Sequence, residues 1–111
     1  MYVDDRSRLM HMLDAAKQAC EFIKGKKRED LDRDAVLMHA LIRVIEIIGE
    51  ASNYISDKCK SDYPEIPWID IKNTRNRLIH GYFKINLNVV WDTVSNDIPV
   101  LIKQIEKILN E

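Results

Sequence analysis

The residues best suited to chemistry lie together in one short stretch, Arg75 to Tyr82. Arginine keeps its charge and can bind a phosphate through two parallel hydrogen bonds, and histidine exchanges protons near neutral pH. Arg75 and His80 are therefore the minimal set for metal-independent RNA cleavage, in which the ribose 2′-hydroxyl attacks its own phosphate. DNA lacks that hydroxyl, so the pair predicts an RNA substrate and no DNA. Because almost every protein contains both residue types, the surroundings of the pair must decide.

Apolar residues recur at helical spacing over 68–82 and predict a helix that carries this stretch. On a helical wheel, Arg75 falls near the centre of an apolar arc. That arc consists of Trp68, Ile71, Leu78, Ile79, Tyr82 and Phe83. An arginine there must find a carboxylate, reach solvent, or face a cleft or subunit interface, and a structural ion pair is the simplest of these. His80 lies about 140° from Arg75 beside Gly81, where a helix end favours the charged imidazolium.

A preceding helix carries a polar stripe within about 80° of arc. The stripe consists of His39, Arg43, Glu46, Glu50 and Asn53. A solvated face is the simpler interpretation, but the spacing of Arg43, Glu46 and Glu50 suits side-chain pairing. We expect Glu46 or Glu50 to support Arg75, with Arg43 in the same cluster. Basic residues gather at 24–28 and again around Arg75, where Lys72 and Arg77 are candidates for phosphate contacts.

Composition limits the alternatives. The chain of 111 residues is long enough for one domain, 1–111, and not two. It is 46% apolar and 32% charged, which is typical of a globular protein, and its net charge of -1 argues against a long electrostatic footprint on nucleic acid. The polar start of the chain is unlike a signal peptide, and no apolar run approaches the roughly 18 residues of a membrane span. We therefore expect a cytoplasmic protein without a membrane partner.

No metal or cofactor site is expected. The three histidines, His11, His39 and His80, lie in different segments, and the chain has no HExxH or ExxH motif. It also has no glycine-rich phosphate loop and no GxSxG motif. Cys20 and Cys59 lie far apart in helical patterns, without a CxxC motif, and are expected to be reduced and structural.

The pattern along the chain predicts an all-α fold, an antiparallel four-helix bundle. The helices are expected at about 5–24, 32–59, 68–82 and 87–109. The first has its apolar stripe at Leu9, Met12, Leu13, Ala16, Ala19 (or Cys20) and Ile23, and Gly25 is a stop signal. The second has its stripe at Leu37, Leu41, Val44, Ile48, Ala51 and Ile55, flanked by further apolar residues that indicate a central helix. Asn86 is a cap for the last helix, in which Pro99 predicts a kink or break at 96–98.

The string Arg75-Asn76-Arg77-Leu78-Ile79-His80-Gly81-Tyr82 reads R-N-x-x-x-H-x-Y and resembles the signature of the HEPN superfamily. The resemblance is closest to its HepT-like branch and covers nearly the whole chain. Further matching segments lie at 47–51, 67–68, 82–83, 90–91 and 97–99, in the family's order.

The resemblance implies a helical homodimer in which two motif-bearing helices meet at a cleft. Arg75 and His80 would then be the catalytic pair, with Asn76 orienting them. It further implies the toxin of a toxin–antitoxin pair, whose nucleotidyltransferase antitoxin transfers AMP from ATP to Tyr82. That group would add bulk and negative charge near Arg75. The alternative is a non-catalytic helical module that binds a nucleotidyltransferase partner or RNA, because members of a superfamily can keep a fold and lose its chemistry.

Overall fold

The computed structural model describes residues 1–80 and 84–111, with side chains described for 1–78 and 84–111. Two long antiparallel helices form its centre, α1 (Val3–Phe22) and α2 (Ala35–Asn53). Every residue of the predicted α2 stripe is buried, and in α1 Leu9, Met12, Ala16 and Ala19 are fully buried. After α1 the chain turns at Gly25, whose φ of 74° suits glycine. The 3-10 turn η1 (Arg28–Asp32) then leads into α2, which Asp34 caps through Leu37 N–H.

The prediction of one helix over 32–59 is wrong, because the chain breaks after Asn53 and starts a short helix, α3 (Asp57–Asp62). Ser56 caps α3 by accepting a hydrogen bond from Cys59 N–H. The same serine donates its hydroxyl to the buried carboxylate of Asp5 at 2.6 Å, and its N–H donates to the other carboxylate oxygen at 2.8 Å. Asp5 of α1 therefore fixes the start of α3, and the break has a tertiary cause.

The next helix, α4 (Trp68–Leu78), is shorter than predicted. Residues 79–80, expected to be helical, instead form the strand β1 (Ile79–His80). This strand pairs antiparallel with β2 (Lys84–Ile85), Ile79 opposite Ile85 and His80 opposite Lys84. The motif therefore starts on a helix and continues into the first strand of a hairpin.

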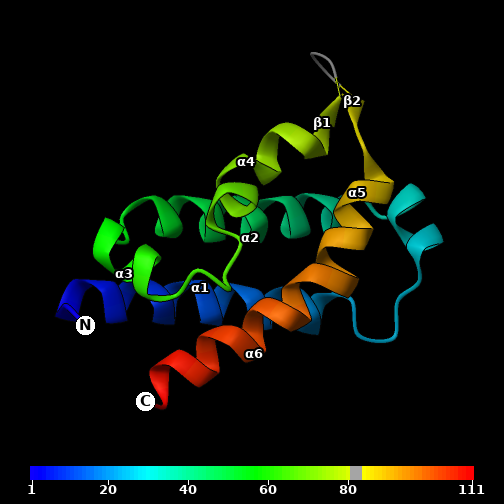
Figure 1. Ribbon diagram of the computed structural model, residues 1–111. Coiled ribbons are helices and arrows are strands. Elements are labelled where there is room, and N and C mark those ends of the chain that lie inside the picture. Colours follow the sequence, from blue (N-terminus) through cyan, green and yellow to red (C-terminus); the bar gives the residue numbers. More distant parts are fainter. Residues whose placement is uncertain (81–83) are drawn as a thin grey trace.

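The last helical segment runs through α5 (Leu87–Asp92), the π-helical turn η2 (Thr93–Asp97) and α6 (Ile98–Leu109). Asn86 caps α5 as predicted, by accepting a hydrogen bond from Val89 N–H. The expected kink near Pro99 takes the form of this π turn, where Ile98 N–H bonds to Thr93 O. Pro99 has no N–H for the carbonyl one α-turn before it, which favours a wider turn at this place. The helical ribbon changes direction here (Figure 1).

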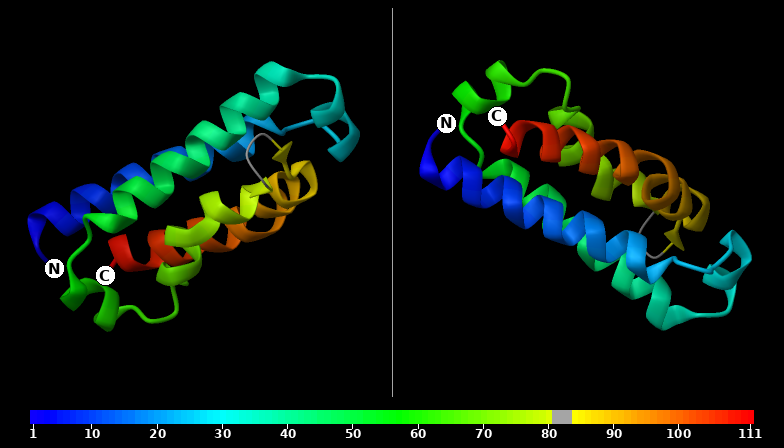
Figure 2. Two further views of the ribbon diagram at one scale, coloured as in Figure 1. Left: turned by 90° about the horizontal axis from the view of Figure 1, so that it is seen from above. Right: turned by 90° about the horizontal axis from the view of Figure 1, so that it is seen from below.

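The helices form two layers, visible from above and below in Figure 2. α1 packs against α2 and α6, and α4 covers α2 on the other side. The buried apolar side chains of all these helices form a single core cluster. The predicted all-helical bundle is confirmed, with the small hairpin as an addition. Within the described part of the chain, none of the helices combines the length and apolar character that crossing a bilayer requires.

Candidate functional site

Arg75 lies on α4 in an ion pair with Glu46 of α2. Its Nε donates a hydrogen bond to Glu46 Oε2 at 3.2 Å. The side chain of Arg75 is 62% exposed and that of Glu46 only 27%. The arginine is therefore not in the middle of a buried face, contrary to the wheel: α4 buries Thr74 and Leu78, and Arg75 stands at the edge of that face. Glu46 holds one edge of the guanidinium, and the exposed remainder is free to meet an anion.

The sequence predicted that either Glu46 or Glu50 supports Arg75, and in the structure Glu46 is the one that pairs with it. Glu50 pairs instead with Arg43, at 3.4 Å, and both side chains are 61% exposed. The two arginine–carboxylate pairs are neighbours on one face of α2, because Glu46 and Glu50 lie one turn apart. His39 and Asn53, at the ends of the predicted stripe, are exposed. The stripe therefore faces solvent, except where Arg75 reaches over Glu46.

Close packing of α2 against α4 sets the position of Arg75. A Cβ atom on Gly49 would lie 3.4 Å from the carbonyl oxygen of Ile71, so the two backbones approach closely there. Thr74 of α4 is buried and donates its hydroxyl to Asp70 O at 2.6 Å. A small residue on α2 thus brings α4 near enough for Arg75, one turn after Ile71, to reach Glu46.

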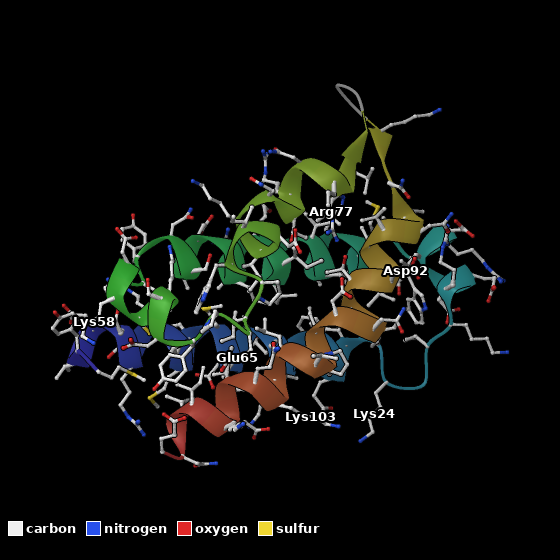
Figure 3. All side chains as sticks on the ribbon, in the orientation of Figure 1. Lys24, Lys58, Glu65, Arg77, Asp92 and Lys103 are labelled. Atoms are coloured by element: carbon white, nitrogen blue, oxygen red, sulfur yellow. The ribbon has the colours of Figure 1, made fainter. Side chains whose placement is uncertain are left out.

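The other polar residues of α4 divide between two sides of the helix. Lys72 and Asn76 are exposed. Arg77 lies about 160° round the helix from Arg75 and pairs with Asp97 of η2 at 3.8 Å. Figure 3 shows Arg77 beneath α4, on the side that faces the last helical segment. The structure therefore separates Arg77 from Arg75. No local sequence signal pointed to Asp97 as its partner, since the two residues are distant in the chain.

For the other half of the motif the structure gives the backbone of His80 only. His80 belongs to β1, so its predicted place on a helical wheel, four residues after Asn76, is wrong. Its side chain lies outside the described part of the chain. Tyr82, the predicted modification site, also lies outside the described residues. The helix from which its place beside Arg75 was inferred ends at Leu78.

Perturbed titrating groups lie away from Arg75. Burial raises the pKa of the Cys59 thiol, and the nearby Asp5 and Asp62 add to the effect. Burial, with Glu21, likewise raises the pKa of Cys20. A hydrogen bond to Glu111 raises the pKa of Tyr63 to about 12. Both cysteines are free thiols, and raised pKa values make them poor nucleophiles. Among the residues that the structure describes, no group of three or more His, Cys, Asp or Glu side chains could hold a metal ion.

This geometry can bind an anion such as a phosphate at the open edge of Arg75. The histidine that would move a proton follows two residues after the end of α4. The fold is helical, and the arginine and histidine of the motif lie near the end of one of its helices. Residues 12–108 match the family model described as Ribonuclease HepT-like. The chain belongs to this HepT-like ribonuclease family, which confirms the resemblance predicted from the sequence.

Relatives of similar length support the assignment. A protein of Caldanaerobacter subterraneus subsp. tengcongensis named "Putative RNase" is 37% identical over 106 residues, covering 96% of this chain and 95% of that protein. A protein of Thermococcus cleftensis named "Probable ribonuclease HepT" is 37% identical over 107 residues, covering 96% of this chain and 92% of that protein. No solved structure matches the chain.

Proposed function

We propose that this protein is a metal-independent endoribonuclease that acts as the toxin of a toxin–antitoxin pair. The family match supports cleavage of RNA. The observation that carries the finer proposal is the arginine of the motif, exposed on one edge and held on the other by Glu46 at 3.2 Å. An arginine in this arrangement is preorganised for a phosphate without losing its contact with solvent.

In the proposed reaction the ribose 2′-oxygen forms a bond to its own phosphorus, and the bond to the 5′-oxygen of the next nucleotide breaks. The 2′-hydroxyl loses its proton and the leaving 5′-oxygen gains one, with His80 as the group that moves the proton; the products are a cyclic phosphate and a free 5′-hydroxyl. Arg75 stabilises the extra negative charge on the phosphorus oxygens. Asn76 orients the pair, and Lys72 contacts a neighbouring phosphate. Arg43 and Glu50, paired beside Glu46, complete the polar surface around Arg75.

We further propose that the protein acts as a homodimer, in which a second motif-bearing helix closes the open side of Arg75. A nucleotidyltransferase antitoxin would silence it by transferring AMP from ATP to the Tyr82 hydroxyl, with release of pyrophosphate. The support is the tyrosine two residues after His80 in the motif. The added phosphate would compete with RNA for the cationic site.

The test is RNA cleavage by the purified protein in excess chelator, with Tyr82 first shown by mass spectrometry to be unmodified. We expect the wild type to cleave and Arg75→Ala and His80→Ala to lose about 100-fold or more of the rate. A product ending in a cyclic phosphate would identify attack by the 2′-hydroxyl. Equal cleavage by all three proteins would refute the site. No cleavage by the wild type, with retained RNA binding, would instead support the non-catalytic module.

A further inference from the structure

A hollow in the described surface lies on the far side of α4 from Arg75. It is a groove of about 400 Å³ between α4, η2 and α6. Its apolar lining includes Ile45 and Ile48 of α2, Ile71 of α4, and Ile98 and Leu101 of α6. A volume of this size lies within the range of about 300–1,000 Å³ that is common for small-molecule sites. The groove can therefore hold a compact apolar body such as one aromatic ring system.

The charged residues around this groove are mainly acidic. Glu65, Asp70 and Asp97 line it, and Arg77 is the only cationic residue among the described residues that do so. Arg77 meets Asp97 at 3.8 Å, and the Asp97 side chain is 66% exposed, so this ion pair is long and weakly held. Glu65, labelled in Figure 3, enters the lining from the loop before α4. The resulting excess of negative charge favours a ligand that carries a positive charge.

A second observation points to a ligand at the same place. Thr93 lines the groove and is only 6% exposed, yet its hydroxyl has no hydrogen-bond partner among the described residues. A buried hydroxyl without a partner is costly, and such groups are rare in folded proteins. Thr93 and Asp97 are the first and last residues of the π turn, so they lie on nearly the same side of it. π turns inside helices frequently mark functional positions.

We propose that this groove is a binding site for a small organic cation with an apolar ring. The ring packs on the isoleucines of the floor, and the ammonium group lies between Asp70 and Asp97. One of its N–H groups donates to the Thr93 hydroxyl after a small adjustment of the π turn. Thr74 and Arg77, both in the lining, lie on either side of Arg75 in the chain. A ligand in the groove would therefore contact α4, the helix that carries the proposed catalytic arginine.

The test uses 2-phenylethylamine as the probe and amide shifts in ¹H–¹⁵N spectra of the full chain as the readout. We expect saturable shifts that centre on Thr74, Thr93 and Ile98, with a Kd of about 1 mM, as is usual for a ligand of this size. The matched anion 3-phenylpropionate should bind about tenfold more weakly or not at all. Equal binding of the anion would overturn the proposal, and so would shifts that lie elsewhere.

Two double variants check the role of charge. Asp70→Asn/Asp97→Asn should weaken binding of the amine about tenfold. Asp14→Asn/Glu21→Gln removes the same two charges from exposed positions of α1 and should leave binding unchanged. If both pairs weaken binding equally, general charge and not the groove is responsible. If groove amides shift with protein concentration while the amine has no effect, a second copy of the chain covers the groove and the proposal is wrong. None of these readouts requires RNA cleavage, so they stand apart from the proposed function.

Discussion

Glu46→Gln tests whether the ion pair with Arg75 serves activity or only folding. The change keeps the size of the side chain and a hydrogen-bond acceptor but removes the charge. At a separation of about 4 Å the attraction of two unit charges ranges from about 1 kcal/mol in water to about 4 kcal/mol near a protein surface. Measured exposed pairs retain only about 0.2–1 kcal/mol of this. Because Arg75 is 62% exposed and Glu46 27%, we expect a loss of about 0.7 kcal/mol in unfolding free energy.

That loss is too small to reduce the amount of folded protein noticeably, since a domain of this size has a stability of about 5–15 kcal/mol. Activity should respond more strongly. Without its carboxylate the guanidinium of Arg75 samples other positions, and a positioning error costs rate steeply. We expect a fall of about tenfold in kcat for RNA cleavage, equivalent to about 1.4 kcal/mol in the barrier. Urea unfolding and initial cleavage rates, both measured on the same preparation, separate the two effects.

Two controls make the test of Glu46 decisive. Asp62→Asn removes an exposed ion pair of similar geometry on α3, with Lys58 at 3.1 Å, and should change stability slightly and activity not at all. In an Arg75→Ala background, Glu46→Gln should have no further effect on rate, because a positioning residue acts only through its partner. Full activity of Glu46→Gln, or an equal loss in the Arg75→Ala background, would refute the positioning role.

Three further experiments test the structure elsewhere. Asp5→Ala removes two hydrogen bonds to Ser56 and should lower the unfolding free energy in a urea titration by about 3 kcal/mol. The control Asp4→Ala, at an exposed neighbouring position, should lower it by less than about 1 kcal/mol. Thr93→Val should raise the unfolding free energy by about 1 kcal/mol and the Tm by about 4 °C, because a buried unpaired hydroxyl is lost. Thr93→Ser keeps the hydroxyl and should not stabilise the protein. Cys59 should react with iodoacetamide more slowly than the unfolded chain does at pH 8.5, since its raised pKa keeps the thiol protonated; equal rates would contradict its burial.

Sequence patterns predicted the parts of the fold that depend on local periodicity. The stripes of α1 and α2, the turn at Gly25 and the cap at Asn86 all rest on residues within a few positions of one another. The break before α3 could not be predicted in this way. The apolar stripe continues through Ile55 to Cys59, while the cause of the break, Asp5, comes from the far end of the chain. The strand Ile79–His80 was missed for the same reason, because its two residues are extended only through pairing with Lys84 and Ile85.

The motif itself shows most clearly that the spacing of residues in the sequence does not determine which partners they meet in the fold. Arg75 and Arg77 are two residues apart and look equivalent in the sequence, yet α4 directs them about 160° apart. One meets Glu46 on the open face of α2, and the other meets Asp97 at the acidic groove. The helix therefore separates the edge that we propose for a phosphate from the edge that we propose for a cation. Since both edges belong to one short helix, a ligand that displaces Arg77 from Asp97 can alter the position of Arg75 without contacting RNA. Comparing the RNA cleavage rate with and without 2-phenylethylamine in wild type and Asp97→Asn would measure that coupling, which an equal response of the two proteins would disprove.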